Sequence, residues 1–511
     1  MILCIQLFLL YNNQLLAVET WHLQSVQYLM VFIMLLIGAS VSIRSLIYWM
    51  KAYVFIAIAW GFTGLFVWFG GTNGEALQIT TITMALPPSI KLSGPFNQGN
   101  IFAAAIGFAW LFSHWLYIQE KKSIYAIALV FFTALLFDTL SRGGWASYLI
   151  TCALLLYALK VNYGLVIKKL LPIWLSGLLL GIFFFTMRYQ LADSEGITFI
   201  TETASHSLTA RLLIWIAAII EFINAPLTGA GWGQFQATFW TVKPSAIAWI
   251  ESHWAMSIPF QSIPYNAHNL FFHILAEAGL IAFFALCWGI YKLGHASIKL
   301  IVKGNSVRLP FALAASAFVL QAQINVIFHR PMLLLVAAFF AGIALAPWLW
   351  QKSWKIQSSI PVKAVSVTLS FLTVVWAYQL SSQWFKAEQA ILSLNVEDKA
   401  SIEDLIEFTT HPRIGAISLT WLGFTVAQKQ QHLPLLTWMN PYLRASVNEV
   451  PSILANQVLF YSYSYSQQAE AACRIGRVIS SQKIPGENNT QFYKDTCLSN
   501  KPGVYIFGTN Y

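Results

Sequence analysis

The chain has 511 residues, of which 57% are hydrophobic and 10% are charged, and its mean hydropathy is +0.61. A soluble globular protein carries roughly 25% charged residues, so this composition excludes an ordinary soluble protein and indicates an integral membrane protein. The formal net charge is +10, but no clustered basic soluble face of the kind that binds nucleic acid is visible. We therefore expect no nucleic-acid partner and interpret the excess of basic residues as a signal of membrane sidedness.

Apolar stretches long enough to cross a bilayer recur through the first 380 residues. A transmembrane helix needs about 20 mostly apolar residues, and the first such stretch lacks the basic residues and cleavage site of a signal peptide. We therefore predict an all-α, polytopic membrane protein with about 11 transmembrane helices. The predicted spans are residues 1–18, 24–41, 49–70, 98–117, 123–140, 143–160, 167–187, 268–291, 309–329, 332–350 and 361–380.

Lysine and arginine are concentrated in every second loop between these stretches. Cytoplasmic loops carry an excess of these residues, so we expect the basic loops and the N-terminus to be cytoplasmic and the alternate loops to face out. Residues 188–267 then form a large outer loop, and residues 381–511 form an outer C-terminal domain. The basic side is defined by Arg44, Lys51, Lys121, Lys122, Lys160, Lys168, Lys169, Lys292, Arg308, Lys352 and Lys355.

Both outer segments are predicted to be helical. In the loop, the apolar stretch 212–223 is too short for a span, so we expect a re-entrant or surface-lying helix facing protein or a wet cavity. In the tail, spaced Ala, Leu and aromatic residues punctuated by prolines suggest a helical domain of TPR-like kind, without a clean repeat. Cys473 and Cys497 lie in this tail and could pair in an oxidising compartment, a question that the sequence leaves open.

Polar groups that are far apart in the sequence are predicted to share the outer face. His268 stands where the outer loop enters a span, and ionisable residues in membrane segments are usually functional. Its imidazole can take or give a proton near neutral pH. Each group alone could be an interfacial residue with its polar end in water, but the set indicates a site. Its other members are Asn97, Gln98, Arg142, Arg211 and Arg330.

The arginines favour an anionic ligand. A guanidinium binds phosphate oxygens bidentately and keeps its charge where water is scarce. Arg142 opens a span, where the helix N-terminus adds backbone N–H donors for an anion. Thr209 predicts a similar helix start just before Arg211. The amides of Asn97 and Gln98 suit sugar hydroxyls or a phosphate, although a turn and a helix cap explain them equally well.

Metal chemistry is not expected. His268 and His273 are five residues apart, so they do not form the i, i+4 pair of a helical metal site, and the sequence has no other metal-binding or nucleotide-binding motif. We therefore predict no metal and no cofactor. Glu277 lies about 180° around the helix from His268, so we do not expect it to be the direct partner of that histidine.

Three stretches together resemble the bacterial O-antigen ligase and O-antigen polymerase superfamily, and within it chiefly the pilin-type protein O-oligosaccharyltransferases (PglL-like). The first stretch is Gly94–Asn100, and the second runs from Arg211 to Gly231. The third begins with His268-Asn269-Leu270-Phe271 and continues to Ala276-Glu277-Ala278-Gly279-Leu280. Their order and sidedness match over residues 20–380.

The resemblance implies a glycosyltransferase-C-like enzyme in the bacterial inner membrane. Residues 1–380 are then the transmembrane catalytic domain, and residues 381–511 are a periplasmic domain that docks the acceptor. The expected reaction transfers a glycan from an undecaprenyl-pyrophosphate carrier to a Ser or Thr hydroxyl of a protein, and the expected protein is a type IV pilin. The expected partners are that lipid-linked oligosaccharide, the protein acceptor and membrane lipid.

The resemblance also implies roles for individual residues. His268 is the expected general base, and Arg211 is expected to stabilise the pyrophosphate. The donor-binding residues are expected to be Asn97, Gln98, Arg142, Asn269 and Arg330. The turn Phe328-His329-Arg330-Pro331-Met332 departs from the acidic, aromatic and proline residues of many relatives, which suggests a narrow, pilin-dedicated acceptor range.

Two other functions stay open at the level of the sequence. Within the same superfamily, the chain could ligate glycan to a lipid core or polymerise lipid-linked glycan. Alternatively, a membrane transporter could use the arginines and the histidine to line a substrate path. A transporter predicts polar groups distributed through the depth of the membrane, whereas here they cluster at one face, which favours surface chemistry.

Overall fold

The structure is a computed structural model, and the part it describes is helical throughout, without a strand. This confirms the predicted all-α class. The described residues are 6–7, 9–10, 15–70, 92, 96, 98–159, 163–191, 195–254, 264, 266–304, 306–349, 419–420, 423, 433–449, 451, 453–466 and 468–480.

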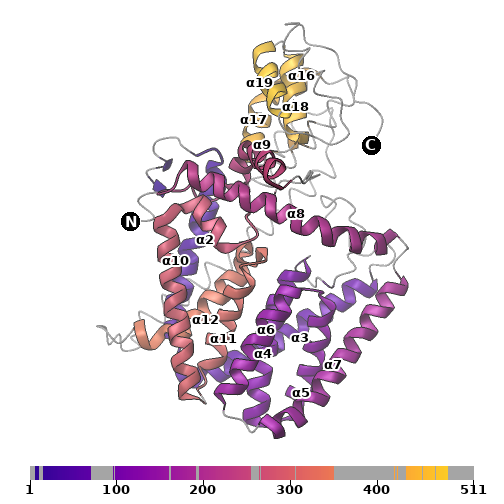
Figure 1. The fold of residues 1–511 in the computed structure, drawn as a ribbon, viewed down its shortest axis with the longest axis vertical. Helices are drawn as coiled ribbons and strands as arrows, with labels where there is room; N and C mark the ends of the chain where they lie inside the picture. Colours follow the sequence, from indigo (N-terminus) through magenta and orange to yellow (C-terminus); the bar gives the residue numbers. More distant parts are fainter. Residues whose placement is uncertain are drawn as a thin grey trace.

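Long apolar helices run side by side in one bundle, and consecutive helices alternate in direction (Figure 1). Six of the described helices are long and apolar enough to cross a membrane, and α5 and α11 are apolar but shorter. The count of about 11 spans is therefore not confirmed. The bundle contains α2 (Val18–Ser40), α3 (Leu46–Gly70), α4 (Gly99–Glu120), α5 (Ser123–Asp138), α6 (Arg142–Ala158), α7 (Tyr163–Leu191), α10 (Leu270–Lys303), α11 (Leu309–Gln321) and α12 (Pro331–Leu349).

The centre of the bundle is α4, which is buried along most of its length. Small residues allow neighbouring helices to approach it closely. A Cβ at Gly107 would lie 2.0 Å from the ring of Tyr148. The Tyr148 hydroxyl donates to the Ala104 carbonyl at 2.8 Å, and the Tyr53 hydroxyl donates to the Ala105 carbonyl at 3.1 Å. These contacts hold α4 against α3 and α6. The N-terminal end of α4 contributes to the candidate site described below.

The predicted span 309–329 is wrong at its end. Helix α11 stops at Gln321, and after a turn the chain forms the short 3-10 helix η4 (Val326–His329). The polar groups at this break form bonds to other helices. The Gln321 side chain donates to the Asn100 carbonyl at 2.9 Å, and the Ala322 carbonyl accepts from Leu270 N at 3.0 Å.

The predicted span 1–18 is also not confirmed by its described residues. Gln6 Oε1 accepts from Trp232 N at 2.9 Å, and Leu9 and Leu15 lie in an apolar cluster with Ala278. These residues therefore pack against the outer loop and α10. The predicted span 361–380 lies outside the described residues.

Two helices of the outer loop, α8 (Glu195–Asn224) and α9 (Phe235–Trp254), lie over one end of the bundle (Figure 1). The short apolar stretch 212–223 is the last part of the 30-residue α8, so it belongs to a surface-lying helix. The prediction of a helix start at Thr209 is wrong, because α8 begins well before that residue. The two helices bury an apolar interface that includes Leu213, Phe239 and Ala267.

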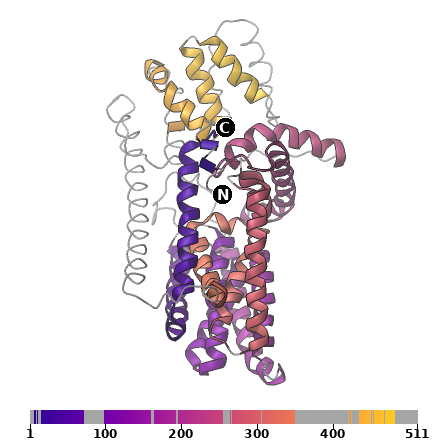
Figure 2. The same cartoon turned by 90° about the vertical axis from the view of Figure 1, so that its left-hand side faces the viewer.

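The C-terminal helices lie beyond the same end of the bundle (Figure 2). Glu449 joins them to the start of α2, since its carboxylate accepts from Thr20 N at 3.2 Å and from Thr20 Oγ1 at 2.6 Å. Cys473 is disulfide-bonded, whereas Cys497 and the predicted boundary at residue 381 lie outside the described residues. These helices are α16 (Leu433–Trp438), α17 (Asn440–Glu449), α18 (Ile453–Tyr465) and α19 (Ala469–Ser480).

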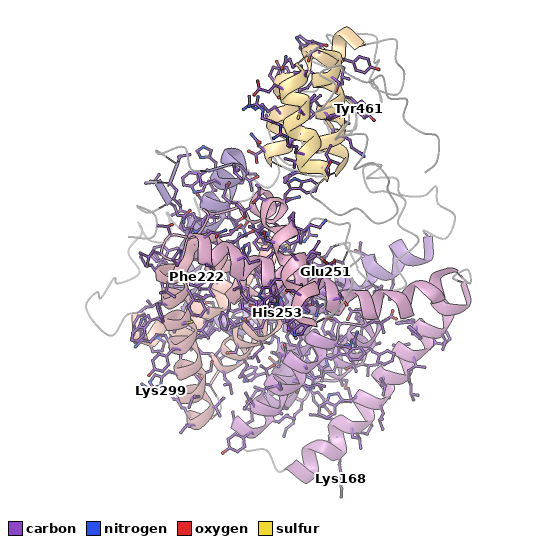
Figure 3. All side chains as sticks on the ribbon, turned by 45° about the horizontal axis from the view of Figure 1, so that its top comes forward. Lys168, Phe222, Glu251, His253, Lys299 and Tyr461 are labelled. Atoms are coloured by element: carbon purple, nitrogen blue, oxygen red, sulfur yellow. The ribbon has the colours of Figure 1, made fainter. Side chains whose placement is uncertain are left out.

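The lysine-rich turns lie at the other end of the bundle. Figure 3 places Lys168 and Lys299 away from the helix that carries Tyr461. Lys121 and Lys122 lie in the turn between α4 and α5, at the same end. These turns are among the loops that were assigned from the sequence to one side of the membrane because they are rich in lysine and arginine.

Candidate active site

The starts of three bundle helices and the end of α11 are joined at the end of the bundle below α8 and α9. The amide of Asn269 Nδ2 donates to the Gln323 carbonyl at 2.9 Å, which ties the start of α10 to the turn after α11. A Cβ at Gly143 would lie 2.7 Å from Asn325 Nδ2, so the start of α6 packs closely on the same turn. With the bond from Gln321 to Asn100, the starts of α4, α6 and α10 share one platform.

His268 has an unusual backbone conformation just before α10. Its φ is 52°, in the left-handed region, which is rare and costly for a residue with a side chain. Asn266 Oδ1 accepts from His268 N at 2.9 Å, and Asn269 Oδ1 caps the helix by accepting from Phe271 N at 2.8 Å. The asparagines on both sides therefore hold the backbone of the histidine in this conformation.

Helix α8 crosses the first turn of α10 and brings Arg211 to the histidine. Trp215, one turn after Arg211, lies with its ring 5.8 Å from that of Phe272. Burial, together with the nearby guanidinium of Arg211, lowers the pKa of His268 from 6.5 to about 4. Arg211 and His268 are 57 positions apart in the sequence, yet they form one electrostatic unit.

Arg142 is the third member of this unit. Burial, and secondarily the charge of Arg142, lower the pKa of Arg211. Arg142 is exposed at the start of α6, whose cap Ser141 accepts from Gly144 N at 3.3 Å. In the described part of the chain neither arginine forms an ion pair. Two like charges beside a helix N-terminus favour an anion between them.

Two buried N–H donors near the histidine have no hydrogen-bond partner within the described residues. They are Asn266 Nδ2 and Trp215 Nε1. Unsatisfied buried donors are uncommon because each costs desolvation free energy, and a bound anion would satisfy them. Sequence reasoning missed both residues. The Asn266-x-His268 spacing, which allows an Asx turn, was the available signal for one of them.

The remaining predicted donor-binding residues have different surroundings. Gln98 precedes α4, and its side chain makes no cap hydrogen bond to that helix. Asn97 lies outside the described residues. Arg330 is exposed after η4. Asn269 uses its carbonyl for the α10 cap and its amide for Gln323, so the structure gives it a positioning task, and donor binding by Asn269 stays a prediction.

His273 and Glu277 lie one and two turns further along α10. His273 is fully buried, and its Nε2 is 3.3 Å from Glu277 Oε2. The Glu277 carboxylate accepts from the backbone of the loop between α8 and α9. It thus points to the outer loop and not along the helix toward His268. Among the described residues, no three potential metal ligands come together.

This arrangement places a buried imidazole near the guanidinium of Arg211, which in turn lies near that of Arg142. It suits a reaction in which a neutral base takes a proton close to an anionic leaving group. Gln98, just before α4, and Arg330, just after η4, are further polar residues at this end of the bundle.

Comparison with known proteins supports the same chemistry at the level of the superfamily. A family model described as O-antigen ligase (Wzy_C) matches residues 127–287, a region that includes Arg142, Arg211 and His268. No curated protein and no solved structure matches the chain. The family match supports membership of the O-antigen ligase superfamily and an enzyme that acts as a glycosyltransferase-like ligase on lipid-linked oligosaccharide.

Proposed function

We propose that the protein transfers a glycan from an undecaprenyl-pyrophosphate-linked donor to a Ser or Thr hydroxyl of a protein acceptor, a type IV pilin. The reaction takes place at the periplasmic face of the inner membrane. The observation that carries the proposal is the packing of α8 on the first turn of α10, where the rings of Trp215 and Phe272 lie 5.8 Å apart and where Arg211 acts on the pKa of His268. The pair combines a proton acceptor with a phosphate-binding cation.

In the proposed reaction, His268 takes the proton of the acceptor hydroxyl while that oxygen attacks the anomeric carbon of the glycan. The new C–O bond forms as the bond from the anomeric carbon to the pyrophosphate oxygen breaks. The leaving lipid pyrophosphate keeps the electron pair. Arg211 and Arg142 stabilise its negative charge, and the N–H groups of Asn266 and Trp215 that lack a partner within the described residues are further candidate donors.

Donor binding increases the basicity of His268 in this scheme. In the free protein, burial and Arg211 hold the pKa of His268 at about 4, so the imidazole is neutral at pH 7 but accepts a proton weakly. A bound pyrophosphate offsets the charge of Arg211 and favours the imidazolium. The base is therefore strongest when the donor is present, which discourages proton uptake from water in its absence.

The C-terminal helices favour a protein acceptor. They lie beyond the end of the bundle that carries the site (Figure 1), where a folded acceptor must approach. Helix α17 contacts the start of α2 through Glu449, so these helices are attached to the same end. This inference rests on placement and on analogy with the superfamily.

The test is glycan transfer in membranes supplied with an undecaprenyl-pyrophosphate glycan, comparing wild type with His268→Ala. Mass spectrometry of outer-surface proteins, with and without the gene, identifies the acceptor. Loss of a sugar mass from a pilin-like protein is the expected result. Unchanged glycosylation in His268→Ala, with normal protein levels, contradicts the proposed base.

O-antigen ligation to a lipid core is the second candidate, because the family match carries that description. It uses the same donor and the same base, with a lipid-borne sugar hydroxyl as the acceptor. In the experiment above, a change confined to lipopolysaccharide would establish this reaction. That result would be compatible with the proposed roles of His268 and Arg211. It would contradict only the proposal that the acceptor is a pilin.

A further inference from the structure

Helix α10 breaks nine residues after it leaves the site region, at Gly279. The backbone there has φ 70° and ψ −171°, outside the helical region. The loop after α8 fills the break. Ala230 N donates to the Ala276 carbonyl at 2.8 Å, and Leu280 N donates to the Pro226 carbonyl at 2.9 Å. The loop is thus hydrogen-bonded into the kink on both sides.

The fit between loop and kink is close enough to require glycine. A Cβ at Gly229, whose φ is 68°, would lie 2.3 Å from Ala278 N. A Cβ at Gly279 would lie 2.4 Å from the Leu227 carbonyl oxygen. Real side chains do not tolerate such distances from backbone atoms, so the two segments are in direct backbone contact.

Glu277 is the side chain that secures this contact. Its Oε2 accepts from Gly233 N and its Oε1 accepts from Phe235 N, both at 2.9 Å. Phe235 is the first residue of α9, so the carboxylate also caps that helix, where negative charge is favourable. The carboxyl group is fully buried, and His273 Nε2 lies 3.3 Å from it. One side chain therefore joins α10, the loop and α9.

We propose that Glu277 is a positioning residue, whose carboxylate clamps the loop between α8 and α9 to the kink of α10 and thereby holds Arg211 against His268. Arg211 lies on α8 before this loop, at roughly 20 Å from the end of the helix, given a rise of 1.5 Å per residue. His268 precedes α10. A rotation of α8 at the loop consequently moves the guanidinium relative to the imidazole.

Apolar packing between α8 and α10, which includes the contact between Trp215 and Phe272, is non-directional. The carboxylate of Glu277 adds directional bonds to the backbone bonds between the loop and the kink. The catalytic significance of Glu277 rests on the proposed function, whereas its effect on the relative position of Arg211 and His268 does not. The test therefore uses readouts that need no glycan transfer.

The experiment compares full-length wild type with Glu277→Gln. Gly233 N and Phe235 N bond to different oxygens of Glu277, and Gln replaces one of these acceptors by an NH2 donor, so the pair of bonds cannot form in the same geometry. Hydrogen exchange of residues 231–236 reports the clamp. The pH dependence of His268 carbethoxylation by diethyl pyrocarbonate, followed by peptide mass mapping, reports the charge environment of the imidazole. We expect exchange there to accelerate at least several-fold and the carbethoxylation midpoint to rise above its wild-type value near pH 4, by the part of the shift that Arg211 causes.

Glu221→Gln is the matched control. Burial raises the pKa of Glu221 well above its usual range, so a neutral amide is a close substitute, and the Glu221 carboxyl accepts no backbone N–H among the described residues. We expect this control to leave both readouts unchanged. If Glu277→Gln does not fold, Glu277→Asp, which keeps both acceptors with a shorter reach, should give smaller shifts in the same directions.

Two outcomes overturn the proposal. Unchanged exchange at residues 231–236 shows that Glu277 does not clamp the loop. Faster exchange with an unmoved His268 midpoint shows that the clamp is local and does not position Arg211. Absence of glycan transfer by the wild-type protein would instead contradict the proposed function. Hydrogen exchange at residues 231–236 and the carbethoxylation midpoint of His268 would still decide the positioning role of Glu277.

Discussion

The two ends of the helical bundle both carry positive charge but use it differently. At one end, Lys51 and Lys122 pair with Glu120 at 2.6 and 3.0 Å, with side chains partly or largely exposed. At the other end, Arg211 is half-buried beside Arg142 and forms no ion pair within the described residues. Paired, exposed lysines contribute little free energy and report sidedness. Within the described residues, Arg211 has no acidic partner and acts on a buried imidazole, an environment that suits an anionic ligand.

The largest expected effect of a single substitution is at His268. Removal of the base in His268→Ala should lower the rate of glycan transfer by ~10²–10⁴-fold, the usual contribution of general base catalysis. His295→Ala, an exposed histidine near the other end of α10, should leave the rate unchanged. Transfer rates in isolated membranes, normalised to protein level, measure both. An equal loss of transfer rate in His268→Ala and His295→Ala would contradict a specific catalytic role for His268.

The next largest effect is expected for Arg211→Lys. An ammonium cannot reproduce the bidentate bonds of a guanidinium, and a hydrogen bond to a charged group contributes about 1.5–3 kcal/mol. The affinity for undecaprenyl pyrophosphate should therefore fall about 10- to 100-fold. Arg44→Lys, at the exposed opposite end, is the matched control and should bind normally. Unchanged affinity in Arg211→Lys would count against the phosphate-binding role.

Asn266→Ala should have an intermediate effect. It removes the acceptor that holds His268 N and releases the strained conformation of the histidine. One hydrogen bond contributes about 1 kcal/mol, so transfer should fall about five-fold in kcat with little change in thermal stability. A fall in stability without a fall in kcat would assign Asn266 to folding alone.

Arg142→Gln should have the smallest effect of the series. Its guanidinium is exposed, so solvent and salt screen its interaction with a phosphate. We expect a loss of about two- to five-fold in donor affinity at low salt, from an exposed-pair contribution of up to about 1 kcal/mol. The loss should shrink at high ionic strength. If Arg142→Gln lost as much donor affinity as Arg211→Lys, the exposed Arg142 would contribute as much to binding as the half-buried Arg211, contrary to this prediction.

The helical class, the gathering of polar groups at one end of the bundle and the start of α6 at Arg142 could all be predicted from the sequence. It was misleading where a helix is set by its tertiary partners. Helix α11 stops at Gln321, where polar groups bond to α4 and α10, and α8 begins at Glu195, well before the expected start at Thr209.

The convergence of Arg211 and His268 could not be predicted from their spacing. It depends on a loop that fits into the break at Gly279 and on a carboxylate, Glu277, that appears in the sequence only as an acid on an apolar helix. The roles of Asn266 and Trp215 were likewise hidden, because they depend on which buried N–H groups stay without a partner.

The pKa of His268 tests the central claim most directly. Burial and Arg211 hold this pKa at about 4, so the neutral base is present above that pH and lost below it. Removal of the nearby cation favours the imidazolium and raises the value. Carbethoxylation of His268 against pH should therefore give a higher midpoint in Arg211→Gln than in wild type, and an unchanged midpoint in Lys299→Gln at the opposite end. The same midpoint in all three proteins would contradict the convergence of Arg211 and His268 in one site.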